Sequence, residues 1–410
     1  MLRSLIFFWL GMVTSVWGAE QAATPPESIQ VHPGFQVELL HSAREEDGSW
    51  ISMTFDDQGR LIIARDDAGL VRVVLPTESS PLTVETLAFT NVLKHCRGLL
   101  YAHHSLYVSA TNTPALYRLR DLNDDDIFEE FELLRKIDYR SRYGHGTNQI
   151  LLGPDQNIYW VIGNDVSFPE AFDPQSPYRD PRNDWALPHP HDAGQDNRVG
   201  FLLKTDPDCQ TWTIMAGGFR NQVDAAFNAD GELFTWDADM EWDAGLPWYR
   251  PTRINHVVSG GEYGWRWGTG KWAEWYPDSL PTTHDTGYGS PTGLEFGTNS
   301  DWPRPFQKKL FAADWQNGRM LAIDLTPIGA TYSATSKLFL EGAPLNICDL
   351  TFGPDGQMYF ITGGRGSQTG LYRVTYVGPH SPVEQPDITE SQLREATKHR
   401  AVRRELEELH

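Results

Sequence analysis

Cysteine is scarce in this chain of 410 residues. Only three occur, Cys96, Cys209 and Cys348, at widely separated positions. Three thiols form at most one bond, which excludes a disulfide-stapled scaffold, and no C-x-x-C-H or paired C-x-x-C spacing is present to attach haem or hold zinc. We expect all three to be buried or unpaired thiols.

Positive charge is also in short supply. Lys and Arg number 34 against 55 Asp and Glu, which gives a formal net charge of −21. A surface of this sign repels the phosphates of nucleic acids and of anionic lipids, so we expect neither as a partner. It suits soluble carbohydrates, cations or a basic redox protein.

Long apolar runs are missing beyond the N-terminus. Residues 1–18 carry one Arg, an apolar run of about a dozen residues and a small-residue end, as secretory signals do. The run is too short to cross a bilayer as a helix. We therefore expect a signal peptide over 1–18, no membrane span in the mature chain, and export to a periplasm or the cell surface.

The middle of the chain shows no helix-period pattern, but a short phrase recurs there. Each copy joins a turn of the Pro-Asp-Gly kind to a strand rich in branched and aromatic residues. Clear copies start at Gly153, Asn228 and Gly353, and looser ones at Phe55, His103 and Phe306. Counted from Asp57, the starts lie 46, 50, 75, 78 and 47 residues apart. This spacing is typical of propeller blades, so the six copies predict an all-β, six-bladed β-propeller over 27–377 whose blades begin near these phrases.

The pattern changes after Tyr376. Residues 378–386 hold three prolines and predict a linker. Thr389 and Gln392 then form a capping box, and a thin apolar stripe follows at helical spacing. Its members are Leu393, Ala396, Val402, Leu406 and Leu409. We expect 378–410 to be a linker and a short, charged C-terminal helix.

An acidic run near the second phrase has the spacing of an EF-hand loop. Its positions 1, 3, 5, 7, 9 and 12 are Asp121, Asn123, Asp125, the carbonyl of Ile127, Glu129 and Glu132. Ca²⁺ needs six to eight such oxygens from a turning backbone. Asp126 replaces the usual Gly at position 6, a substitution that Asp tolerates better than most residues. The run predicts a structural Ca²⁺ site, and a solvated acidic loop is the alternative.

A second acidic run alternates carboxylates with apolar residues. Asp237, Asp239, Glu241 and Asp243 would share one face if the segment is extended. Like charges on one face repel unless a cation or arginines lie among them. We expect a bound cation here, with Arg250 and Arg253 as alternative partners.

Three ordered blocks carry a family resemblance. They are HGTNQILLGPDQNIYWVIGN from His145, GGFRNQVDAAFNADGELFTW with Arg220 and Asn221, and TRINHVVSGGEYGWRWG with Asn255. Over roughly 30–376 the chain resembles the soluble quinoprotein glucose/sorbosone dehydrogenases. It is most similar to the propeller modules of large membrane-bound dehydrogenases that continue into helical repeats and a cytochrome c domain.

The resemblance implies a cofactor and a site. The family binds pyrroloquinoline quinone with Ca²⁺ over the channel mouth and uses a His to take the proton of a sugar hydroxyl. His145 matches that base. Asn164 matches the Asp that orients it in the family, and the neighbouring Asp165 is the alternative for this role. Arg220 and Asn221 match cofactor-binding residues. The chemistry requires a base that titrates near the working pH and a cation that polarises the quinone carbonyl.

The chain departs from the family pattern at three cationic positions. Gln316, Asn346 and Cys348 replace a Lys and two Arg, although a tricarboxylate needs cations around it. We expect Arg319 and Arg365 to take over this role from nearby loops. The family's carbonyl ligands for Ca²⁺ match Asp239 and Met240, which places the implied metal beside the second acidic run.

The sequence thus predicts an exported oxidoreductase that oxidises a sugar or sugar alcohol and passes electrons to a separate carrier such as a cytochrome c. Two other functions stay open. One is a Ca²⁺-dependent sugar lactonase or other hydrolase, since propellers also host carboxylates around a channel metal. The other is a carbohydrate-binding propeller without catalysis.

Overall fold

The computed structural model describes most of the chain. The described residues are 22–66, 69–87, 92–111, 113–138, 144–169, 171–178, 199–238, 249–266, 270–273, 275–277, 279–379 and 388–410. The predicted signal peptide, residues 1–18, lies outside them. So do Asp239, Glu241 and Asp243 of the second acidic run.

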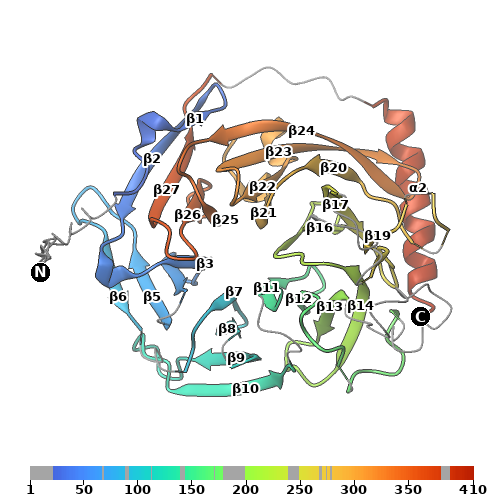
Figure 1. Ribbon diagram of the computed structural model, residues 1–410, viewed down its shortest axis with the longest axis horizontal. Coiled ribbons are helices and arrows are strands. Elements are labelled where there is room, and N and C mark those ends of the chain that lie inside the picture. Colours follow the sequence, from blue (N-terminus) through green and yellow to red (C-terminus); the bar gives the residue numbers. More distant parts are fainter. Residues whose placement is uncertain are drawn as a thin grey trace, which may run out of the picture.

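Six antiparallel sheets are arranged in a ring around a central axis, which confirms the predicted all-β, six-bladed propeller (Figure 1). The first three blades each have four strands joined in sequence order. Blade 1 holds β3 (Trp50–Phe55), β4 (Leu61–Arg65), β5 (Gly69–Val74) and β6 (Thr83–Thr86). Blade 2 holds β7 (Cys96–Ala102), β8 (Ser105–Ala110), β9 (Ala115–Arg120) and β10 (Glu130–Lys136). Blade 3 holds β11 (Thr147–Leu152), β12 (Ile158–Ile162), β13 (Gly200–Thr205) and β14 (Trp212–Phe219).

The last three blades follow the same plan with additions. Blade 4 holds β15 (Ala225–Phe227), β16 (Leu233–Asp237), β17 (Thr252–Val257) and β20 (His284–Gly287), with a hairpin of β18 (Trp265–Arg266) and β19 (Gly270–Lys271) between the last two. Blade 5 holds β21 (Pro291–Phe296), β22 (Leu310–Asp314), β23 (Arg319–Ile328) and β24 (Thr331–Glu341), with the short helix α1 (Arg304–Gln307). Blade 6 holds β25 (Ile347–Phe352), β26 (Met358–Thr362) and β27 (Gly370–Tyr376).

The N-terminal segment closes the ring. Strand β2 (Phe35–Ser42) is the outermost strand of blade 6 and pairs with β27, from Phe35 opposite Tyr376 to Ser42 opposite Gly370. Strand β1 (Gln30–Val31) adds to the outer edge of blade 5. Because β2 completes the sheet of β25, β26 and β27, backbone pairing joins the two ends of the propeller in one four-stranded blade.

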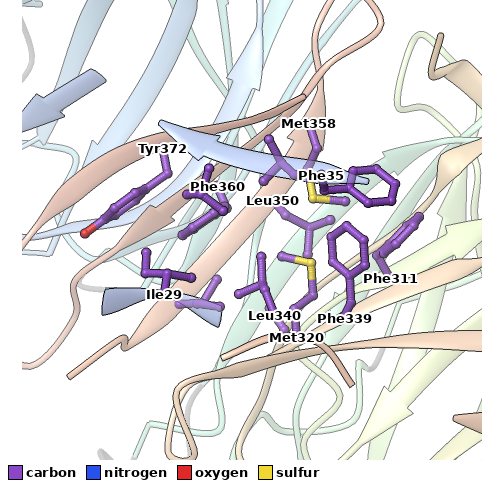
Figure 2. Close-up of a cluster of buried hydrophobic side chains, with 14 of the residues drawn as sticks. Ile29, Phe35, Phe311, Met320, Phe339, Leu340, Leu350, Met358, Phe360 and Tyr372 are labelled. Atoms are coloured by element: carbon purple, nitrogen blue, oxygen red, sulfur yellow. The ribbon is translucent and has the colours of Figure 1, made fainter. Parts of the chain in front are cut away.

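Aromatic packing supports this closure. Phe35 lies edge-on to Trp302, with ring centroids 4.7 Å apart, and to Phe339 at 5.0 Å. These rings belong to a buried cluster that joins β1 and β2 to blades 5 and 6 (Figure 2). Edge-to-face rings add attraction beyond the burial of apolar area. The N-terminal strands are therefore held by a shared core as well as by backbone pairing.

The recurring phrase has a local structural cause. In GPDQNIY the amide of Gly153 donates to the carbonyl of Asn157 at 2.8 Å, and the Tyr159 hydroxyl donates to the Asp155 carboxylate at 3.0 Å. The copy in blade 6 repeats the second bond between Tyr359 and Asp355 at 2.8 Å. Asp thus caps the turn and anchors the aromatic residue of the next strand.

The position of the phrase corrects one prediction. Each copy marks the turn from the first strand of a blade to its second strand, so the blades begin one strand earlier than expected. Blade 3, for example, starts at Thr147 and not at Gly153. Since the strands are antiparallel, the start of each first strand and the end of each second strand lie at one end of the channel. Loops at that end meet around the axis.

Helix α2 (Glu390–Glu407) confirms the predicted C-terminal helix and its capping box. Its packing face differs from the predicted apolar stripe, since Leu406 and Leu409 are 61% and 79% exposed. Arg403 faces the propeller instead and pairs with the buried Glu232 at 2.5 Å. Glu232 also bonds His256 at 2.8 Å. A buried carboxylate needs positive partners, which explains why the basic side of the helix turns inward.

All three cysteines are buried and free, as predicted. Burial raises the pKa of the Cys209 thiol to about 11.

Within the described ranges we find no helix with the length and apolar character that a membrane crossing requires.

Candidate active site

A polar cavity of about 320 Å³ opens at the end of the channel where the first strands start. Each of the six blades contributes to its wall. The lining residues with functional groups are Asp66, Arg97, His145, Asn148, Arg220, Asn221, Ser290, Thr292, Trp315, Gln316, Cys348 and Arg365. Of the site residues predicted from the sequence, the structure brings His145, Arg220, Asn221 and Arg365 together here.

His145 lies just before β11 and is oriented by the loop after β12. Its Nδ1 is 2.7 Å from Oδ1 of Asn164. An amide oxygen only accepts hydrogen bonds, so Nδ1 carries the ring hydrogen and the lone pair stays on Nε2. Asn164 is 1% exposed, which fixes this partner in place.

Asp165 holds the backbone of the base and not its ring. Its carboxylate accepts the amide hydrogen of His145 at 3.2 Å, and its own amide donates to the His145 carbonyl at 2.9 Å. The amide of Asn164 donates to the carbonyl of Arg220 at 2.9 Å. The three residues therefore tie the start of blade 3 to the loop that carries Arg220.

Burial lowers the pKa of His145 below its ordinary value, and the charge of Arg220 lowers it further. The Asn164 hydrogen bond and the charge of Asp165 act in the opposite direction. The net effect favours the neutral imidazole. A neutral His with a fixed tautomer is the form that can accept a proton.

Asp237 organises the loop of Arg220 and Asn221. Its carboxylate accepts the amide hydrogens of Arg220 at 3.0 Å and of Asn221 at 2.9 Å. It also accepts the amide hydrogen of Ala238 at 3.0 Å and lies 3.9 Å from the Arg253 guanidinium. With no exposed surface, this carboxylate serves as an anchor for the backbone. A metal role for Asp237 stays a prediction, since Asp239 and Glu241 lie outside the described residues.

Arg365 reaches the cavity from blade 6. Its backbone amide donates to the Asp66 carboxylate at 3.0 Å, and its guanidinium lies over the Trp315 ring, 5.3 Å from the centroid. Among the described residues its side chain forms no ion pair with a carboxylate. Arg365 thus presents to the cavity a positive charge supported by an aromatic face, and its role as a cofactor-binding cation stays a prediction.

Arg319 is placed differently from the prediction. Its Nε donates to the buried carboxylate of Asp314 at 2.9 Å, and Nη2 donates to the carbonyl of Tyr288 at 2.8 Å. It does not line the cavity. These contacts make Arg319 a support for the loop between β20 and β21.

Arg97 is a residue of the cavity wall that the sequence does not indicate. It lies at the second position of β7, and Nη1 donates to the carbonyl of Gly144, the residue before His145. Its charge also lowers the pKa of His145. No motif marks it, because a single Arg in CRGLLY resembles an ordinary strand start. Only the closure of the ring shows that blade 2 places it beside the base.

Gln316, Asn346 and Cys348, the uncharged residues at the three positions that are cationic in the resembled family, do not all lie in this cavity. Gln316 and Cys348 line the cavity, whereas Asn346 lines a neighbouring cavity of about 180 Å³ and donates to the Trp315 carbonyl at 2.9 Å. Arg97 and Arg365 bring positive charge to the same wall from blades 2 and 6. Arg220, Arg97 and Arg365 together give the wall three guanidinium groups against the single carboxylate of Asp66 among its described residues.

Asn148 carries an unsatisfied acceptor in the wall. Its Nδ2 donates to Oδ1 of Asn221 at 3.2 Å and to the carbonyl of Gln222 at 2.7 Å. Its Oδ1 is buried and has no hydrogen-bond partner in the described structure. A buried acceptor without a partner is costly, and a ligand donor would relieve that cost.

The EF-hand-like loop lies away from the cavity. Carboxylate oxygens of Asp121, Asp125 and Glu129 come within 4.8 Å of one another, close enough to share a metal ion. Glu132 does not join them, because it lies in β10 opposite Arg118 and pairs with it at 2.6 Å. Asp126 turns to Arg60 at 2.8 Å and has a φ of 70°, the region that Gly would favour. Asn123 and the carbonyl of Ile127 stay predicted ligands.

Comparison with known proteins supports the fold. A scan against protein-family models finds no match, and a search of curated proteins finds none either. Solved structures do match over most of the chain. One is the PQQ-bound aldose sugar dehydrogenase of Streptomyces coelicolor, with 17% identity and a TM-score of 0.57 over 84% of this chain and 100% of that one.

Two further structures agree. The soluble aldose sugar dehydrogenase of Escherichia coli in its apo form has 15% identity and a TM-score of 0.58, over 83% of this chain and 99% of that one. The PQQ domain of pyranose dehydrogenase from Coprinopsis cinerea has 12% identity and a TM-score of 0.60, over 85% and 97%. At these identities the likeness establishes the fold, and it confirms the resemblance at that level.

Proposed function

We propose that this protein is an oxidoreductase that binds an anionic quinone cofactor in the cavity and oxidises a hydroxyl group of a carbohydrate. One observation carries the proposal. A neutral, oriented His lies in a cavity with Arg97, Arg220 and Arg365, in a protein whose net charge is −21. Among the described residues, Arg97 and Arg365 have no acidic partner.

The wall fits a group such as pyrroloquinoline quinone. Arg220 and Arg365 would bind its carboxylates, since guanidinium and carboxylate form strong, charge-assisted hydrogen bonds. The free Oδ1 of Asn148 would accept a hydrogen bond from a donor on the bound group. When bound, the quinone supplies the acceptor for the hydride that leaves the sugar carbon.

The chain's own residues supply the proton chemistry. Nε2 of His145 accepts the proton of the substrate hydroxyl while the bond from carbon to hydrogen breaks. Asn164 holds the ring in the tautomer that leaves Nε2 free for this step. Asp165 stabilises the positive charge that the ring gains, which offsets the repulsion from Arg220.

A hydrolase is the less favoured alternative. A metal-dependent lactonase needs several carboxylates around a channel ion, and Asp66 is the only carboxylate among the described residues of the wall.

The oxidoreductase proposal has three further parts. They are export of the protein, a calcium ion beside the quinone and a separate electron carrier such as a cytochrome c.

Titration of the purified protein with pyrroloquinoline quinone, with and without Ca²⁺, tests the proposal. We expect saturable changes in quinone absorbance, a higher thermal midpoint, and dye-linked oxidation of at least one sugar or sugar alcohol. Ligand that binds the native state alone raises the midpoint by mass action. Binding of sugars without binding of quinone would contradict the proposal and favour a carbohydrate-binding propeller.

A second test concerns the acidic loop, which we propose to bind a structural Ca²⁺. Excess chelator is expected to lower the thermal midpoint by a few degrees, because loss of a bound ion removes its contribution to the native state. Asp125→Ala should abolish this response, and Glu132→Gln, which changes a residue outside the cluster, should retain it. An Asp125→Ala protein that responds like the wild type would show that the loop holds no ion.

A further inference from the structure

Arg97 differs from the other arginines of the cavity in its surroundings. Arg365 extends from blade 6 over Trp315 of blade 5. Arg220 precedes Asn221 in the loop that follows β14. Arg97 comes from blade 2 and lies against the residue that precedes the base. Within the described chain the guanidinium groups of Arg97 and Arg365 have no acidic partner, whereas Arg253 and Arg319 both face buried carboxylates. Of these two cavity arginines, Arg97 is the one that contacts the residue before the base.

Gly144 makes this approach possible. Its φ of 98° lies in the left-handed region, and an added Cβ would come within 3.4 Å of Nη2 of Arg97. The carbonyl of Gly144 accepts one of the five N–H groups of the guanidinium. The remaining donors are available on the cavity wall next to His145.

Two positive charges, those of Arg97 and Arg220, act on the base on this side. Arg97 and Arg220 both lower the pKa of His145, so both disfavour the protonated ring that forms during the reaction. Asp165 is the acid that opposes them. An anion bound by Arg97 would offset its effect at the moment the proton arrives. The group nearest the base during the reaction is the substrate.

We propose that Arg97 binds a carboxylate of the substrate, so that the preferred substrates are sugar acids such as uronates and not neutral sugars. The inference rests on the proposed function, of which it specifies the substrate class. One guanidinium without an acidic partner matches a single negative charge, which favours a carboxylate over a phosphate ester with its charge of nearly −2. Arg97 is then a determinant of specificity, separate from the arginines that hold the cofactor.

Matched substrate pairs test the proposal in the full chain loaded with pyrroloquinoline quinone and Ca²⁺. The pairs are glucose with glucuronate and galactose with galacturonate. Glucose 6-phosphate is also tested, to compare a phosphate with a carboxylate. We expect kcat/KM for the uronates to exceed that for the neutral sugars by about 10- to 100-fold, the usual range for a charge-assisted bond. Arg97→Gln should remove this preference, mainly by raising KM for the uronates.

Two variants serve as controls. Arg97→Lys keeps the charge but loses the fork geometry, so it should retain part of the preference. Arg394→Gln removes an exposed positive charge on α2 and should leave both substrates unaffected. Calorimetric binding of glucuronate to the quinone-free protein gives a readout without turnover. Its affinity should fall with Arg97→Gln and with rising salt.

The outcomes separate the inference from the proposed function. Faster oxidation of glucose than of glucuronate, or a preference for glucose 6-phosphate, would overturn the role of Arg97 and leave the oxidoreductase standing. A loss of quinone affinity in Arg97→Gln as large as in Arg365→Gln would assign Arg97 to the cofactor and overturn the inference too. Arg97-dependent binding of glucuronate without oxidation of any sugar would support the anion site and contradict the oxidoreductase.

Discussion

His145→Ala is expected to lower kcat/KM by about 10²- to 10⁴-fold, the usual contribution of a general base. The imidazole lies in a loop at the cavity and not in the core of a blade, so the variant should fold. Steady-state rates with dye as acceptor measure the loss, and circular dichroism and the thermal midpoint check folding. His145→Gln keeps a donor for Asn164 and should be equally inactive. A rate within threefold of the wild type would remove His145 from the mechanism.

The pH dependence of kcat/KM tests independently whether His145 acts as the general base. A base must be neutral to act, so activity is lost as the pH falls through the pKa of His145. Burial and Arg220 lower that pKa, so we expect activity to extend below the ordinary titration range of His. Asn164→Asp places a carboxylate at Nδ1 and raises the pKa. The acid limb of kcat/KM should therefore move to higher pH, and an unchanged limb would show that another group titrates.

Local chemistry explains what could be predicted from the sequence. A turn capped by Asp and followed by an aromatic strand is stabilised within a few residues, as Asp155 and Tyr159 show. The number of blades and the all-β class follow from counting such turns. The capping box of α2 is local in the same sense. Such features do not depend on how the ring closes.

The parts that could not be predicted depend on distant neighbours. Spacing alone assigns Glu132 to a calcium loop, but the pairing of β10 with β9 sets it opposite Arg118. Alternation predicts that Asp237 belongs to an acidic face that binds a cation, yet its carboxylate accepts the amide hydrogens of Arg220 and Asn221. Arg97 lies beside the residue before His145 only because blade 2 packs beside blade 3. The contacts of these three residues are determined by sheet register and by the packing of neighbouring blades.

The double variant Arg220→Gln/Arg365→Gln is expected to weaken quinone binding by about 10²- to 10⁴-fold. Each charge-assisted hydrogen bond contributes about 1.5–3 kcal/mol, and about 1.4 kcal/mol changes an affinity tenfold. Glutamine keeps a hydrogen-bond donor and much of the side-chain volume, so the loss would report on charge. Absorbance titration of the quinone in the presence of Ca²⁺ measures the dissociation constant of each single variant and of the double variant.

Arg319→Gln is the matched control, because the sequence predicts a cofactor contact for Arg319 whereas the structure pairs it with Asp314 outside the cavity. Its dissociation constant should equal that of the wild type once folding has been verified by the thermal midpoint. Equal losses from Arg319→Gln and Arg365→Gln would mean that the quinone responds to the overall charge at this end of the propeller. A loss confined to Arg220 and Arg365 would instead place the carboxylates of the quinone between blades 4 and 6, where Trp315 supports the guanidinium of Arg365. That arrangement would leave Arg97, on the side of the base, for the substrate.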